Sequence, residues 1–350
     1  MSIVTRPAAD RAVQGTAVPV AAPEPGATQP ILPGRRRRSP RPVSQRETSQ
    51  HPVSPRKSFP RKARTLVPPK PASVVFSMAL TMVAALITLQ LMNIIVISPL
   101  QHSTAQARLY DQLRLTLSEG SAPLGQADFE GTLVAPGTPL ALLEIPDLSV
   151  REVIVEGTAS AQTMDGVGHR RDTPLPGQPG TSVLMGRSGA FGGAFRNLNL
   201  AAPGSTFTVT TAQGVASYQV TGQRRAGDTA PPPPSRAEGR LTLITADGPP
   251  FMPDEVLRVD AKLVSKAFDK PAPVIQPGSL PGQEQAMGQD TSNLFVLVLC
   301  LQLLIIVALA AVWSWKRWGK WETWIVFLPV VGAAALLTGT QINYLLPNLL

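Results

Sequence analysis

The stretch that decides the fold is Leu-Thr-Leu-Ile-Thr-Ala-Asp-Gly at Leu241–Gly248. Apolar and β-branched residues followed by Asp-Gly predict a buried strand that ends in a polar turn. Similar short segments recur between turn signals, at Leu140–Ile145, Glu152–Val155, Thr181–Met185, Thr206–Thr210, Ser217–Thr221 and Val256–Leu263. Thr158–Met164 predicts one or two helical turns. About 140 residues with seven or eight short strands indicate a closed β-barrel or a sandwich, so this region is mainly β.

Four blocks, taken in order, resemble the sortase family. They are LLEIPDLSV at Leu142–Val150, the block from Val153 to Gly180 that contains GVGH, the block from Thr181 to Val209, and LTLITA followed by EVLRVDAKL at Glu255–Leu263. The resemblance covers roughly residues 135–268, and the GRSGAFGGAF spacing is most similar to the actinobacterial class E branch. It implies an eight-stranded β-barrel on a membrane-anchored transpeptidase.

The family's catalytic positions fall on three residues of this chain. The resemblance assigns the nucleophilic cysteine to Ala246, the histidine to Arg187 and the arginine to Arg258. A methyl group cannot form an acyl-enzyme, and a guanidinium stays protonated near neutral pH, so neither replacement supports the chemistry. We therefore expect no catalytic residue and a sortase-like pseudoenzyme that acts as a binding or scaffold module at the cell envelope.

Two alternatives stay open from the sequence. An active, cysteine-independent transpeptidase or hydrolase would need Thr245, Asp247 or Ser188 as its nucleophile. A structural membrane subunit would depend instead on its spans, where small and polar residues such as Gly339 and Asn343 suit helix packing.

We assign the expected binding groove to Arg187, Asp247, Arg258 and His169. Two arginines that face each other repel, so Asp247 is expected to pair with one of them and to leave a positive charge for an anion. His169 is expected to be a hydrogen-bonded structural residue, with a general base as the alternative. The ligand is expected to be peptide-like or anionic and the partner an envelope protein, with no metal and no cofactor.

Charge gathers in the first part of the chain. Residues 1–73 hold 14 of the 32 Lys and Arg residues, including the run Arg35–Arg38, and only three acids, Asp10, Glu24 and Glu47. With 14 prolines and a single aromatic residue, this segment is expected to be a disordered cytoplasmic tail. A polybasic segment beside a span is typical of contact with anionic lipid, and this explanation is preferred to nucleic-acid binding.

Three uncharged stretches are long enough to cross a bilayer. The expected layout is a first span at 74–97, a juxtamembrane amphipathic helix and linker at 98–130, the ectodomain at 131–268, a flexible linker at 269–291, spans at 292–313 and 323–346, and a cytoplasmic loop at 314–322. Tryptophans and basic residues at this loop indicate an interfacial belt, and Cys300 is an unreactive residue inside its span. The ectodomain and C-terminus are then outside the plasma membrane of a Gram-positive cell, and the N-terminus is cytoplasmic.

Overall fold

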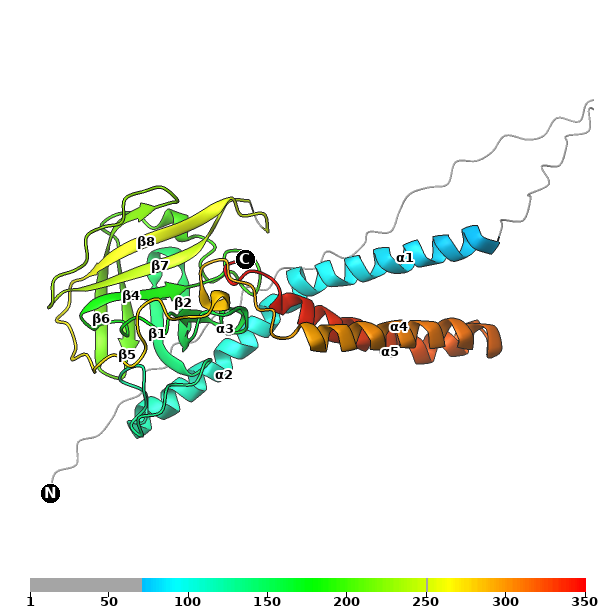
Figure 1. The fold of residues 1–350 in the computed structure, drawn as a ribbon, viewed down its shortest axis with the longest axis horizontal. Helices are drawn as coiled ribbons and strands as arrows, with labels where there is room; N and C mark the ends of the chain where they lie inside the picture. Colours follow the sequence, from blue (N-terminus) through cyan, green and yellow to red (C-terminus); the bar gives the residue numbers. More distant parts are fainter. Residues whose placement is uncertain (1–70, 250) are drawn as a thin grey trace, which may run out of the picture. The chain divides into compact units, whose positions relative to one another are not determined.

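Eight strands close into a β-barrel in the order β1-β2-β3-β4-β7-β8-β6-β5 (Figure 1). The computed structural model describes residues 71–249 and 251–350. The strands are β1 (Pro139–Ile145), β2 (Val150–Glu156), β3 (Val167–His169), β4 (Gly180–Met185), β5 (Thr206–Thr211), β6 (Gly214–Arg224), β7 (Gly239–Asp247) and β8 (Glu255–Leu263). The expected eight-stranded barrel is confirmed. The sequence missed only β3, because three residues are too few to display an alternating pattern.

Strand β7 runs through the region that matters most for function. It pairs in parallel with β4 and antiparallel with β8. Successive side chains point to opposite faces, so Leu241 and Leu243 enter the barrel core, while Ile244 and Ala246 join a second apolar cluster outside it. The core also contains Phe207 and Tyr218, whose rings stack with centroids 5.5 Å apart.

A long helical segment leads into the barrel. It consists of α1 (Pro71–Met92), a π-helix η1 (Asn93–Ile97) and α2 (Ser98–Glu119). The expected tail at 1–73 lies outside the described residues, apart from the three that begin α1. Helix α2 packs on the barrel: the Gln106 amide donates to the carbonyl of Asp165 at 2.7 Å and accepts from the N–H of Val153 at 2.7 Å. The amphipathic helix expected within residues 98–130 therefore contacts the domain.

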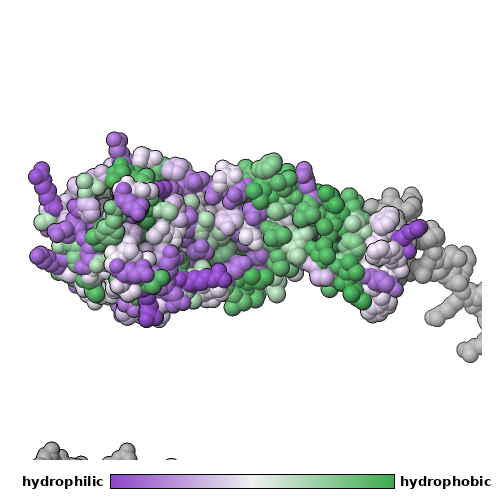
Figure 2. Space-filling model, turned by 90° about the horizontal axis from the view of Figure 1, so that it is seen from below, coloured by the Kyte–Doolittle hydropathy of each residue, from purple (hydrophilic) through white to green (hydrophobic). Residues whose placement is uncertain are grey.

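Among the described residues, three helices are long and apolar enough to cross a membrane, and they lie within residues 83–119, 294–315 and 321–344. The last two belong to α4 (Leu294–Arg317) and α5 (Lys320–Tyr344), which run side by side (Figure 1). Apolar surface gathers over the helices and polar surface over the barrel (Figure 2). Leu304 of α4 packs with Ala334 and Ala335 of α5, and Leu86 of α1 lies against the same cluster.

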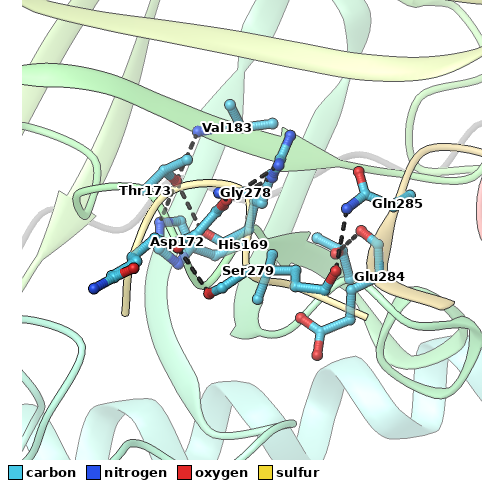
Figure 3. A network of polar contacts seen from close by, with 12 residues as sticks. His169, Asp172, Thr173, Val183, Gly278, Ser279, Glu284 and Gln285 are labelled. Carbon is cyan, nitrogen blue, oxygen red and sulfur yellow. Dashed lines mark hydrogen bonds and ion pairs between the residues drawn. The ribbon is translucent and has the colours of Figure 1, made fainter. Parts of the chain in front are cut away.

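Residues 269–291, expected to form a flexible linker, lie against the barrel instead. Apart from the short 3-10 helix η4 (Gly282–Glu284), they have no regular structure, as their Pro and Gly content predicts. The N–H of Gly278 donates to the Asp172 carboxylate at 2.8 Å, and buried Glu284 lies 3.4 Å from an Arg171 nitrogen (Figure 3). These anchors join residues more than a hundred positions apart, which composition alone does not reveal. We call residues 269–291 the strap.

Candidate functional site

The outer face of β4, β7 and β8 carries an apolar cluster. Val183 and Met185 of β4 meet Ile244 and Ala246 of β7, and Val256 of β8 packs against them. Ala246 is 5% exposed. The position that the sequence resemblance gives to a nucleophile is therefore a buried methyl group. It has no lone pair and no titratable proton, so it supplies neither attack nor proton transfer.

A segment that is distant in sequence covers this face. After α5 ends at Tyr344, residues Leu346–Leu350 turn back onto the barrel, and we call them the plug. Leu349 belongs to the same apolar cluster as Ala246 and is 0% exposed. Ala286 and Met287 of the strap complete the cover. The apolar groove face around Ala246 is thus covered by a peptide from the same chain.

Arg187 follows β4 and holds the plug through its guanidinium. It is 1% exposed, and it donates to the carbonyls of Leu350 at 3.1 Å and Pro347 at 3.4 Å. Its other terminal nitrogen donates to the Ser160 hydroxyl at 2.7 Å and to the Ser160 carbonyl at 3.1 Å. The Phe191 ring lies 5.2 Å from its central carbon, a cation–π distance.

Burial sets the protonation behaviour of Arg187. Desolvation lowers the pKa of its guanidinium to about 9, because the charged form loses water. Among the described residues, no Asp or Glu side chain forms an ion pair with it. The group is still a cation at neutral pH, so it donates hydrogen bonds and does not accept a proton.

Two hydroxyls beside Ala246 were candidate alternative nucleophiles. The Thr245 hydroxyl is buried and donates to the carbonyl of Gly186 at 2.9 Å. The Ser188 hydroxyl donates to the carbonyl of Leu349 at 3.3 Å. Both protons are directed to backbone oxygens, and neither hydroxyl has a histidine or carboxylate hydrogen-bond partner in the described part of the chain. Nothing in this geometry activates either oxygen.

Asp247 pairs differently from the expectation. Its carboxylate accepts from Arg225 at 2.8 Å, and Glu255 lies 3.1 Å from the same guanidinium nitrogen. The expected pair of Asp247 with Arg187 or Arg258 is therefore corrected. Arg225 directly follows β6, two strands away from β7 in the sheet order, and its side chain crosses to Asp247.

Arg258 stays on the groove side of the sheet. It pairs in register with Ile244, and its neighbours Leu257 and Val259 both enter the barrel core. Alternation therefore places Arg258 on the same face as Ala246. A small pocket of about 100 Å³ opens beside Ala246 and is lined by Ser188, Phe195, Arg196, Asn199, Thr245, Asp247, Gly248 and Leu257.

His169 of β3 is enclosed and fully partnered. Its Nδ1 lies 2.8 Å from the Glu156 carboxylate, and its Nε2 lies 3.0 Å from the carbonyl of Pro174. The side chain has no exposed surface. Thr173, which also contacts His169, accepts from the N–H of Val183 (Figure 3). This arrangement is that of a residue that holds a loop in place, and it leaves His169 closed to a groove ligand.

The sequence reasoning missed the residues that fill the groove. Asn348 donates to the carbonyls of Thr158 at 2.7 Å and Gln285 at 2.8 Å, and Ser160 donates to the carbonyl of Leu346 at 3.0 Å. One signal was available: Pro347 follows an apolar helix and precedes Asn-Leu-Leu, so the helix was bound to end there. The third span expected from the sequence, 323–346, overlaps the plug at Leu346, whereas α5 ends at Tyr344.

Comparison with known proteins shows what this domain is similar to. Residues 143–264 match the model of the Sortase domain family. Among solved structures, a sortase D5 transpeptidase from Clostridium perfringens is 19% identical over 47% of this chain and 98% of its own, with a TM-score of 0.38. Sortase E1 from Streptomyces coelicolor, with a tripeptide in its active site, is 26% identical over 38% and 92%, with a TM-score of 0.33. Sortase C-1 from Actinomyces oris is 29% identical over 36% and 75%, with a TM-score of 0.31. The comparison with curated proteins gives no match.

Proposed function

We propose, from the premise that residues 143–264 of this chain are a sortase-family domain, that the protein is a membrane-anchored module that binds peptide without cleaving it. One observation carries the proposal. The floor of the groove presents a buried methyl at Ala246 and a buried, hydrogen-bonded cation at Arg187. Cleavage of an amide needs a nucleophile, and it needs an acid for the leaving amine. Neither residue supplies one.

The groove retains what binding requires. Arg187 and Ser188 present N–H donors that point at backbone carbonyls, and the apolar cluster accepts a leucine side chain. Donors of this kind recognise an extended peptide through its main chain. The partner on this proposal is a segment of an envelope protein.

Charge and connectivity support one membrane orientation for the protein. The barrel is joined to α1 through α2 and to α4 through the strap, and the plug after α5 returns to the barrel. All three helices therefore meet the barrel at one end. The Trp-rich turn between α4 and α5 lies at the other end of these helices. The basic segment 1–73 leads into α1 in the sequence, and basic flanks of this kind favour the cytoplasmic side. We place the barrel outside the plasma membrane.

The test uses the full chain in lipid nanodiscs with a fluorescent sorting-type peptide and hydroxylamine. We expect no peptide hydroxamate from the wild type. The matched variant combines Ala246→Cys with Arg187→His and so supplies the missing thiol and imidazole. If this variant forms product and the wild type does not, the residues at these two positions account for the inactivity. Product from the wild type that is lost in Thr245→Val or Asp247→Asn would replace our proposal with the cysteine-independent enzyme.

Partner binding is tested separately in membranes of the native cell. A photo-crosslinking amino acid replaces Phe251, an exposed residue beside Gly189 at the groove edge, or Leu133, an exposed residue of the loop before β1. We expect a discrete adduct from position 251 and none from position 133. Equal labelling at both positions would contradict a groove-directed partner.

A further inference from the structure

The plug occupies the groove as a bound peptide would. We propose that the plug is a displaceable ligand in cis, and that the groove accepts in trans a peptide of the same chemistry, Pro-Asn followed by an apolar residue. The inference rests on the proposed function, because it names the regulation and the ligand class of the same groove.

The plug is held largely through its backbone. The carbonyl of Leu349 accepts from the N–H of Ser188 at 2.9 Å, and the carbonyl of Leu350 accepts from Arg187 at 3.1 Å. Ser160 donates to the carbonyl of Leu346 at 3.0 Å. Main-chain carbonyls are common to all peptides, so these donors serve a second peptide equally well once the plug has left.

Two side chains of the plug give the groove its selectivity. The side-chain amide of Asn348 donates to two backbone carbonyls, those of Thr158 and Gln285. The backbone N–H of Asn348 donates to the carbonyl of Gly288 at 3.0 Å. An aspartate there would set a carboxylate against two carbonyl oxygens, which is repulsive in a buried site. The next residue, Leu349, fills the apolar cluster around Ala246. The groove therefore selects a peptide that has a side-chain amide donor followed by an apolar side chain.

The membrane helices determine where the plug sits. Asn343, in the last turn of α5, accepts from the Gln90 amide at 2.9 Å and donates to Asn93 of η1 at 3.3 Å. Only Tyr344 and Leu345 separate Asn343 from the plug. A shift of α5 against α1 would thus carry the plug with it. Changes within the helical bundle are the route by which the groove opens.

Tethering makes the plug a strong competitor. A ligand joined through a short connection experiences an effective concentration of roughly millimolar. A free peptide of the same sequence therefore binds the full chain weakly, and it binds more tightly to a chain without the plug. This difference is the measurable consequence of the proposal.

The experiment uses fluorescein-labelled Leu-Leu-Pro-Asn-Leu-Leu, the sequence of residues 345–350, with the full chain in nanodiscs. In the matched variant, residues 346–350 are replaced by five Gly and Ser residues. We expect the variant to bind at least tenfold more tightly than the wild type, and to bind the peptide with Asp in place of Asn at least tenfold more weakly. Equal affinity of the two proteins, or no binding by a variant with wild-type hydrogen exchange in the barrel, would overturn the inference.

A second readout keeps the plug in place. With Cys300→Ser as background, Leu349→Cys introduces a single thiol, and Met252→Cys at a 74% exposed position gives the reference rate of alkylation. We expect slow labelling at position 349 that accelerates when excess peptide is added. Labelling at the reference rate without peptide, or no acceleration with it, refutes displacement. Failure of partner crosslinking at position 251 would contradict the proposed function. It would leave the peptide-affinity and alkylation results unchanged.

Discussion

The backbone N–H of Ser188 donates to the carbonyl oxygen of Leu349 over 2.9 Å, although 161 positions separate the two residues. The Ser188 hydroxyl points at the same oxygen. One plug carbonyl therefore receives two donors, beside the apolar cluster that contains Ala246. This contact ties the end of the helical bundle to the barrel face that carries Ala246.

Truncation of Leu349 is expected to release the plug locally. A buried leucine contributes about 2–5 kcal/mol over alanine through lost burial and an unfilled cavity. Leu349→Ala should therefore speed hydrogen exchange at the Ser188 amide by a factor of ten or more, while the barrel amides keep their rates. Leu200→Ala, at an exposed position in the short helix Leu198–Leu200, is the matched control and should change neither. Unchanged exchange at Ser188 would mean that Leu349 does not hold the plug.

Removal of the Arg187 side chain is expected to destabilise the domain. Arg187→Leu leaves acceptors of Ser160, Pro347 and Leu350 without a donor, and hydrogen bonds from a charged donor contribute about 1.5–3 kcal/mol each. Relief of the buried charge offsets part of this loss, so we expect a net cost of about 3 kcal/mol in urea unfolding of the full chain. Arg236→Leu, at an exposed loop position, should change stability by less than about 0.5 kcal/mol. If Arg187→Leu lowers the unfolding free energy as little as the control does, the desolvation penalty of the buried charge cancels the hydrogen bonds of Arg187.

Much of this site follows from strand alternation. The pattern of Leu241, Leu243 and Ala246 separates a core face from a groove face before any coordinates are known. The Asp247 partner does not follow from it, because Arg225 reaches Asp247 only once β6, β8 and β7 lie in that order. The role of Asn348 could not be predicted from the sequence for another reason. Its hydrogen-bond partners are backbone carbonyls, which every residue has.

Glu284 of the strap is expected to make stability depend on pH. Burial raises the pKa of its carboxyl above the usual 4.5, although nearby Arg171 lowers it. The folded state therefore holds this proton more tightly than the unfolded state. The contribution to stability is full below pH 4.5 and is lost as pH rises through the raised pKa. The difference in unfolding free energy between wild type and Glu284→Gln should fall across this range, and Glu130→Gln, an exposed control, should show no such trend.

The polar contacts among the candidate membrane helices are expected to control the plug. Asn343→Leu removes bonds to Gln90 and Asn93, and interhelical hydrogen bonds of this kind contribute about 0.6–2 kcal/mol. We expect faster alkylation of a thiol introduced by Leu349→Cys, by roughly threefold to thirtyfold, because that energy range translates into such factors. The control is Gln341→Leu, two positions earlier on α5. If both changes act alike, general loosening of the helix explains the effect.

A cysteine introduced at position 246 is expected to stay unreactive until the plug is removed. In a Cys300→Ser background, the thiol of Ala246→Cys would lie in the apolar cluster with Leu349, where burial disfavours the thiolate that reacts. We expect its iodoacetamide alkylation to accelerate at least tenfold when residues 346–350 are replaced by Gly and Ser. The same replacement should raise peptide turnover by the Ala246→Cys, Arg187→His variant, which the intact plug slows. Equal alkylation with and without the plug would mean that the groove is open in solution, and the plug would then have no regulatory part.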